Sequence, residues 1–229
     1  MVGCLVLGNL YSNVYKGEIQ GQSLAIDIDV FTEDGKSTKD GEKGELVVKQ
    51  PFPSMPVKFW GDDTGKKYHN AYFTKFKNIW HHGDFIERTT NNGFIMRGRS
   101  DATLNPGGVR IGTSEIYQQV EDIEYITEGL VVGQDYNDDV RIILFVTTKS
   151  NEELNEEKIK SIKLKIRKNC SPKHVPSLVI KVPDIPRTKS GKIVELAVKK
   201  IIHGETINNK EAIANPEALE YFKNLPQLK

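Results

Sequence analysis

Two stretches decide the fold of this 229-residue sequence: GRSDATLNPGGVRIGTSEIY at residues 98–117 and PRTKSGK at residues 186–192. The first stretch carries Pro-Gly-Gly at residues 106–108 between short apolar runs, which is typical of a hairpin turn. Before it the sequence reads as short strands and turns, and after it strand and helix patterns alternate. We therefore predict a β-rich part at residues 1–100 and a compact α+β part at residues 101–229.

The β-rich part is predicted from alternating or short apolar runs. We expect strands at residues 24–31, 44–49, 79–87 and 94–98. The opening apolar run at residues 2–10 is interpreted as a buried strand. Residues 51–72 contain three prolines and several aromatic residues without a period, which indicates an ordered surface loop.

The second part combines helices with two apolar strands. The strands are expected at GLVVG (residues 129–133) and VRIILFV (residues 140–146). Helical spacing of apolar residues predicts helices after a cap at Thr113 or Ser114, at residues 155–169 and at residues 194–203. A last helix is expected from Pro216, with Asn215 as its cap.

Charge and cysteine content exclude several classes of protein. A formal net charge of +1 gives no general attraction to nucleic acid or to a membrane surface, so any anionic ligand must be bound by a few placed side chains. The lysines at residues 158–168 alternate with isoleucines and indicate the polar side of a packed helix. Cys4 and Cys170 are the only cysteines, which favours a reducing, cytoplasmic location. We expect no membrane span and no nucleic-acid partner.

The segment TKSGK at residues 188–192 is the first candidate site. It precedes a predicted helix, whose free amides and dipole favour an anion. Lys192 is informative because a cation at a helix N-terminus costs about 0.3–1 kcal/mol unless an anion offsets it. The segment is not a Walker A loop, and a solvated turn is an equally good interpretation of it alone.

Arg99, Arg110 and Asp84 are the other candidates. The two arginines flank the Pro-Gly-Gly turn and have guanidinium groups that suit one shared anion, although a hairpin with solvated arginines explains them equally. Asp84 follows a glycine near a strand end, where a carboxylate can accept hydrogen bonds from ribose hydroxyls, although an ordinary Gly-Asp turn is the better explanation of this residue alone. His81 and His82 are adjacent in a strand and point to opposite faces, so we predict no metal site there.

Three ordered motifs carry a family resemblance. WHHGDF, GRSDATLNPGGVRIGTSEIY and PRTKSGK resemble successive late motifs of the adenylate-forming superfamily of acyl-CoA synthetases, peptide-synthetase adenylation domains and luciferases. Within it, VYKGEIQG, FWGDDTGKKYHNAYF, SPKHVPS and the tail ANPEALEYFKNLPQL are similar to the acetoacetyl-CoA synthetase family. The resemblance covers nearly the whole chain.

The resemblance implies a reaction and a fold. Such enzymes convert a carboxylate and Mg-ATP to an acyl-adenylate and diphosphate, then rotate a small C-terminal domain so that coenzyme A attacks the adenylate. Residues 1–100 would be the β-rich end of the large AMP-binding domain, and residues 101–229 the small mobile domain with its hinge at Asp101. The ligands would be ATP or AMP, Mg²⁺, coenzyme A, and acetoacetate or a similar short acid.

Matching positions also imply roles for single residues. Lys192 would be catalytic, bridging the carboxylate substrate and the α-phosphate during adenylation. The nucleotide-binding residues would be Asp84, Arg99 and Arg110. Coenzyme A would be bound by Gly107 and Gly108, which would line its pantetheine channel, and by Arg167, which would contact a phosphate.

Two family segments do not occur in the sequence: the Ser/Thr/Gly-rich loop that cradles the ATP phosphates and the SGGTD-like segment that follows it. We therefore expect a C-terminal fragment that is inactive alone, with Mg²⁺ bound mainly by the part not present, and a separately encoded N-terminal half as a conceivable partner. We also expect apolar surface at residues 2–7 and 46–48. The alternatives are a non-catalytic remnant that binds coenzyme A or a nucleotide, and a ligase part for acetate or propionate.

Overall fold

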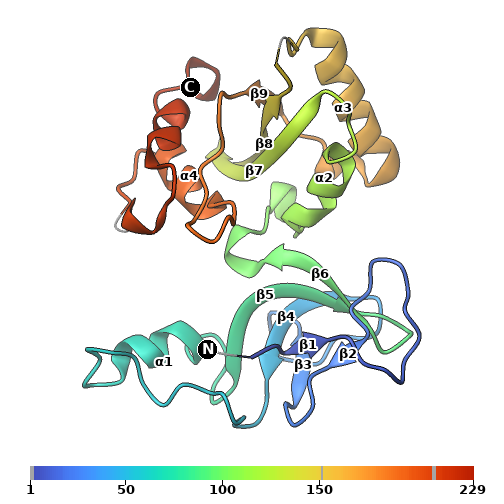
Figure 1. Ribbon diagram of the computed structural model, residues 1–229, viewed down its shortest axis with the longest axis vertical. Coiled ribbons are helices and arrows are strands. Elements are labelled where there is room, and N and C mark those ends of the chain that lie inside the picture. Colours follow the sequence, from blue (N-terminus) through green and yellow to red (C-terminus); the bar gives the residue numbers. More distant parts are fainter. Residues whose placement is uncertain (1–2, 151, 208–209) are drawn as a thin grey trace. The chain divides into compact units, whose positions relative to one another are not determined.

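The chain divides into two compact units, Met1–Ser100 and Asp101–Lys229, called here the first and the second unit. The computed structural model, drawn in Figure 1, describes residues 3–150, 152–207 and 210–229. The division falls at the position where the sequence predicts a domain boundary. Each unit is described by itself below.

The first unit is built on a four-stranded antiparallel sheet in the order β3-β4-β5-β6. Sequential strands lie side by side, as is usual in antiparallel sheets. Residues 89–93 form a short connection from β5 to β6, whereas residues 49–79, which include a helix, connect β4 to β5. A second sheet of two short strands, β1 and β2, belongs to the same unit. The elements are β1 Val6–Leu7, β2 Gly21–Gln22, β3 Ile28–Phe31, β4 Lys43–Val48, α1 Lys66–Tyr72, β5 Trp80–Arg88 and β6 Phe94–Arg99.

Trp80 is at the centre of the first unit's core. Its side chain is 2 % exposed, stacks on Tyr72 with ring centroids 3.6 Å apart, and meets Phe52 edge-on. Tyr68 contacts the same indole ring. Because Tyr68 and Tyr72 lie four residues apart, a helix places both rings on one face, against Trp80. The predicted loop at residues 51–72 is therefore wrong in its last third, which forms α1.

The predicted buried strand at residues 2–10 is also wrong over most of its described length. Strand pairing is limited to β1, which is half-buried, and Leu10 is 97 % exposed. The predicted apolar surface at residues 46–48 is also wrong, because all three residues are buried and Leu46 and Val48 pack in the core of this unit. The large apolar side chains of this unit that are at least 80 % exposed are Leu10, Tyr11, Val14, Leu24, Val57 and Trp60.

The second unit is built on a three-stranded mixed sheet in the order β7-β8-β9. Strands β7 and β8 form an antiparallel hairpin, and β9 pairs parallel to β8 after a helical crossover through α3. The elements are α2 Thr113–Val120, β7 Ile126–Tyr136, β8 Asp139–Thr148, α3 Glu156–Asn169, β9 Leu178–Lys181 and α4 Glu195–Ile202. Short 3-10 helices lie at Ser100–Ala102, Pro106–Gly108, Pro172–His174, Lys210–Ala212, Pro216–Phe222 and Pro226–Leu228.

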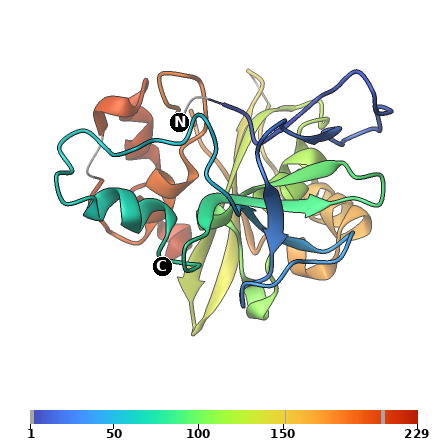
Figure 2. The same ribbon diagram turned by 90° about the horizontal axis from the view of Figure 1, so that it is seen from below.

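Helices cover both faces of this sheet. Along β8, Ile142 and Leu144 pack with α2 and α3, whereas Ile143 and Phe145 point to the opposite face and pack with α4 and the C-terminal 3-10 helix. Figures 1 and 2 show α3 and α4 on opposite sides of the sheet. Alternation of apolar side chains along a strand buried on both faces produces this three-layer arrangement. The α+β architecture predicted from the sequence is confirmed.

The helix ends agree only partly with the sequence predictions. Helix α3 begins after Asn155, whose Oδ1 accepts from the Lys158 amide at 3.0 Å, as its N-cap type predicts. Helix α2 instead begins after Gly112, whose amide donates to the Glu115 carboxylate at 3.0 Å. Among the described residues, no helix combines the length and apolarity that a membrane crossing requires.

Asn215 does not cap the helix that follows it. Its Oδ1 accepts from the Arg187 amide at 2.8 Å, and its Nδ2 donates to Asp184 at 2.6 Å. The segment after it, Pro216–Phe222, is a 3-10 helix. The predicted Asn215 cap is wrong because the side chain binds a neighbouring chain segment instead.

Candidate active site

Lys192 ends a tight turn that starts at Thr188. The Thr188 amide donates to the Lys192 carbonyl at 2.8 Å, and the Lys192 amide donates to Thr188 Oγ1 at 3.0 Å. The Gly191 amide donates to the Thr188 carbonyl at 2.8 Å, with Gly191 at φ 83°, a value that glycine adopts without strain. The turn therefore fixes the backbone of Lys192, which is an exposed residue.

The structure corrects the reason given above for an anion site at this segment. Helix α4 begins only at Glu195, and the amides of Gly191 and Lys192 are bonded within the turn. The helix N-terminus and these amides therefore do not form a single anion-binding site. A positive charge at this turn comes from side chains, of which Lys192 is one.

Two anchors hold the base of the turn. Arg187 donates from its guanidinium to the Gly191 carbonyl at 2.8 Å and forms an ion pair with Glu128 on β7. On the other side, the Lys189 amide donates to the Ala212 carbonyl at 3.1 Å. Long-range bonds on both sides place Lys192 by the fold as well as by the local sequence.

A half-buried acid, Glu195, lies three residues after the turn, at the start of α4. The Tyr117 hydroxyl donates to Glu195 and accepts from the Val131 amide at 3.1 Å. Burial raises the pKa of the Glu195 carboxyl, and burial followed by the charge of Glu195 raises the pKa of Tyr117 well above its ordinary value. The Tyr117 hydroxyl therefore links α4 to α2 and β7.

In the first unit, Asp84 and Arg99 are paired. They are opposite each other on β5 and β6, and an Arg99 guanidinium nitrogen donates to Asp84 Oδ1 at 3.1 Å. The guanidinium crosses Gly83, where an added Cβ would lie 2.7 Å from Arg99 Nη2. Gly83 also has φ 84°. Glycine at this position therefore permits the contact that brings the two predicted residues together.

The two histidines point to different partners, as adjacent strand residues do. His81 Nε2 lies 2.9 Å from Glu45, while His82 Nδ1 accepts from Trp80 Nε1 at 3.2 Å. Burial is the main cause that lowers the pKa of His82, so its ring is neutral at pH 7 with the proton on Nε2, which faces Asp84. Within the described ranges, no group of three or more His, Cys, Asp or Glu side chains is placed to hold a metal ion.

The other predicted site residues lie in the second unit, at three places. Arg110 donates from Nε to Thr103 Oγ1 at 3.3 Å, and Gly107 and Gly108 form the tip of the same loop with φ 57° and 76°. Arg167 lies in the last turn of α3, on an exposed face beside Val175. Asp101 is exposed in the 3-10 helix at the start of the unit. Because Arg99 belongs to the first unit, its shared anion with Arg110 stays a prediction.

Sequence reasoning missed two acidic residues. Glu45 on β4 is fully buried and binds Lys75 at 2.7 Å, His81 at 2.9 Å and the Ser100 hydroxyl. Asp139, at the start of β8, binds the amide of Gly107. A glutamate within the apolar run GELVVK at residues 44–49 was the only signal for the first, and the second had none.

Comparison with known proteins gives the family. Over 229 residues the chain is 56 % identical to acetoacetyl-coenzyme A synthetase of Rhizobium meliloti, matching 100 % of this chain and 35 % of that protein. It is 44 % identical over 231 residues to acetoacetyl-CoA synthetase of Gallus gallus, of which it covers 34 %. The chain thus spans about a third of the length of these relatives. No protein-family profile matches it.

The fold agrees with that result. The solved acetoacetyl-CoA synthetase of Streptomyces lividans superimposes with a TM-score of 0.85 at 39 % sequence identity, over 92 % of this chain and 32 % of that one. Sequence and fold place the similarity in the C-terminal portion of these enzymes. The chain therefore belongs to the adenylate-forming acyl-CoA synthetase superfamily, in which it is similar to the C-terminal third of acetoacetyl-CoA synthetases.

Proposed function

We propose that this chain is the C-terminal part of an ATP-dependent acid–thiol ligase. The reaction is acetoacetate, ATP and coenzyme A to acetoacetyl-CoA, AMP and diphosphate, through an acyl-adenylate. The observation that carries the proposal is 56 % identity to an acetoacetyl-coenzyme A synthetase across the whole chain. A match to one kind of acyl-CoA synthetase over every element favours acetoacetate over acetate or propionate. We propose a cytoplasmic location, with which the free thiols of Cys4 and Cys170 are compatible.

In this proposal Lys192 serves adenylation. Its ammonium bridges the acetoacetate carboxylate and the α-phosphate, where a fixed positive charge stabilises the charge that develops on the transferring group. The turn from Thr188 and its two anchors support this role, because a preorganised charge needs no reorganisation when the reaction occurs. The flexible side chain starts from a backbone that is held in place.

In this proposal three residues of the chain bind the nucleotide. Asp84 accepts hydrogen bonds from the ribose hydroxyls, and Arg99 binds the ribose and phosphate region beside it. Their existing contact is compatible with this role because each carboxylate oxygen has two acceptor positions. Arg110 of the second unit contacts a phosphate in one of the two conformations, which interconvert about the hinge at Asp101.

Coenzyme A is bound by the second unit. Gly107 and Gly108 line the channel for the pantetheine arm, since the absence of side chains allows close approach to the backbone. Arg167 contacts a phosphate of coenzyme A from the end of α3. We assign magnesium and the triphosphate mainly to the N-terminal portion that the relatives have in addition.

The first test uses the chain alone. Without a loop that grips the triphosphate, attack on the α-phosphate is not positioned, so we expect no diphosphate release from acetoacetate, ATP, magnesium and coenzyme A. The measurement compares the purified chain with its Lys192→Ala variant. Equal, background-level release supports the proposal. Release above the variant would contradict the assignment of half an active site to this chain.

A further inference from the structure

The loop that carries Gly107 and Gly108 is closed by backbone bonds at its base. Leu104 and Ile111 exchange two hydrogen bonds of 2.9 Å each, and both side chains are buried. The tip is different, because Gly107 and Gly108 are exposed and both have positive φ. Two consecutive glycines lose much conformational entropy when they are fixed, so this tip needs an external partner to hold one conformation.

Asp139 supplies that partner from 32 positions away. Its Oδ1 accepts from the Gly107 amide at 2.7 Å and from the Val140 amide at 2.7 Å. Asn137 and Asp138 form the two-residue β7–β8 turn with φ 50° and 59°, the left-handed pair expected of a type I′ hairpin. Asp139 follows directly, as the first residue of β8, so the hairpin fixes the position of its carboxylate.

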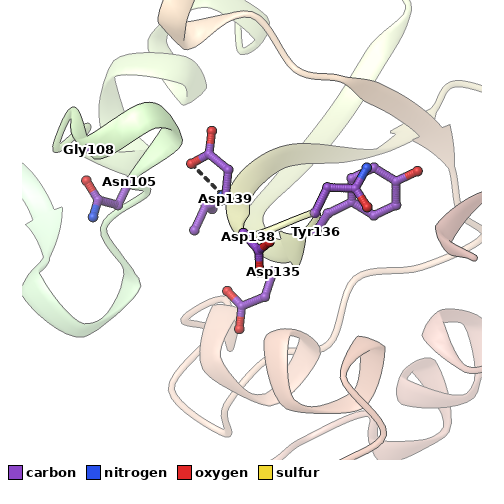
Figure 3. A pocket seen from close by; sticks show the side chains of 8 residues that line it. Asn105, Gly108, Asp135, Tyr136, Asp138 and Asp139 are labelled. Atoms are coloured by element: carbon purple, nitrogen blue, oxygen red, sulfur yellow. Dashed lines mark hydrogen bonds between the residues drawn. The ribbon is translucent and has the colours of Figure 1, made fainter.

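The surroundings of the carboxylate strengthen this contact. The Lys173 ammonium lies over Gly107, 2.4 Å from where a Cβ would be, and its charge helps to keep Asp139 ionised. The Gly107 bond is the main cause that lowers the pKa of Asp139. Figure 3 shows Asp139 between the hairpin and the loop of Asn105 and Gly108. Asp139 also lines an open hollow with a volume of about 610 Å³.

We propose that Asp139 is a positioning residue for the thiol half-reaction. It holds the Gly107 amide so that Gly107 and Gly108 keep the conformation that the pantetheine arm requires. The inference rests on the proposed function for the role of the two glycines, whereas the bond itself does not. Asp139 touches neither the nucleotide nor the acyl group, so the adenylation half-reaction should not depend on it.

The bond is tested on the 229-residue chain by hydrogen exchange of the Gly107 amide, followed by NMR. Asp139→Ala removes the acceptor, and we expect exchange at Gly107 to become at least about tenfold faster, the size typical of a lost bond to a charged group. Asp139→Asn retains an oxygen acceptor and should restore most of the protection. The control is Asp138→Asn, which removes a charge from the neighbouring residue. Asparagine tolerates the positive φ of this position, so the exchange rate of the Gly107 amide should not change. Unchanged exchange in Asp139→Ala overturns the proposal.

The role is tested in a fusion of this chain to the N-terminal portion of the Rhizobium meliloti relative, called the fusion protein. We expect Asp139→Ala to slow coenzyme A-dependent turnover of preformed acetoacetyl-adenylate by about tenfold and to leave acetoacetate-dependent ATP–diphosphate exchange unchanged. Asp139→Asn should recover most of the rate. Equal loss in both half-reactions, or none, overturns the positioning role. If the unmodified fusion protein does not use acetoacetate, the proposed function fails. Hydrogen exchange of the Gly107 amide still tests the Asp139–Gly107 bond in that case.

Discussion

Replacing Lys192 with alanine should lower acetoacetate-dependent ATP–diphosphate exchange of the fusion protein by about 100- to 1,000-fold, the usual loss when one preorganised donor to a developing charge is removed. The turn from Thr188 and the contacts of Arg187 hold the backbone without using the Lys192 side chain. The substitution should therefore remove the charge and leave the turn. Thiol transfer from preformed acetoacetyl-adenylate should be unaffected, because in the proposal Lys192 acts only in adenylation.

Lys189 offers a matched control in the same turn. Its side chain is exposed, and its hydrogen bond to the Ala212 carbonyl is donated by the backbone amide. Lys189→Ala removes an equal charge three residues away and should reduce the exchange rate little. If both alanine variants lost ATP–diphosphate exchange activity equally, the effect would come from the total positive charge of the turn. That result would contradict a specific role for Lys192.

The second large effect concerns the stability of the first unit. Lys75→Met should lower its free energy of unfolding by about 1–3 kcal/mol, less than the cost of removing one partner from a fully buried ion pair, because the Lys75 side chain is 32 % exposed. The reason is that Glu45 is fully buried, with Lys75 Nζ at 2.7 Å as its cationic partner. His81 and the Ser100 hydroxyl still bind the carboxylate and limit the loss.

Urea unfolding followed by tryptophan fluorescence measures this effect, because both tryptophans, Trp60 and Trp80, belong to the first unit. The control is Glu45→Gln combined with Lys75→Met. It leaves no uncompensated charge, so its stability should lie closer to that of the unchanged chain. A single variant as stable as the unchanged chain, or a double variant less stable than the single one, would show that the pair is not coupled as the structure indicates.

Local patterns predicted the second unit well. The run VRIILFV forms β8. Its successive side chains face alternate helical layers, so apolar residues are buried on both faces of the strand. Ile162 and Ile166, four residues apart in α3, are fully buried as their spacing predicts. In these elements the sequence period of apolar residues agrees with the burial pattern in the structure. They can therefore be identified without knowledge of distant contacts.

The first unit was predicted less well, because distant partners decide its structure. Helix α1 has no buried residue of its own and exists where two tyrosines meet Trp80. The same cause explains the wrong Asn215 cap in the second unit, where the side chain suits an N-cap by type but binds Arg187, 28 positions away. A pattern within ten residues does not contain such partners.

The same limit applies to the candidate site. The motif resemblance named Asp84, Arg99 and Lys192, and the structure adds the neighbours that position all three. Gly83 permits the Asp84–Arg99 contact, and Thr188 bonds the Lys192 backbone. The sequence argument attributed an anion site at residues 188–192 to a helix N-terminus, and this reason is wrong because α4 begins only at Glu195. The supporting residues were out of reach because a motif gives the order of residues and not the hydrogen bonds between them.

The measurement that tests the central claim most directly is acetoacetyl-CoA formation by the fusion protein, compared with the N-terminal portion alone and with this chain alone. The account predicts product from acetoacetate, ATP, magnesium and coenzyme A only when the two parts are joined, with acetate and propionate used less well. A fusion protein that folds and binds ATP but forms no acetoacetyl-CoA would contradict the assignment of this chain as the C-terminal part of an acetoacetate-activating ligase.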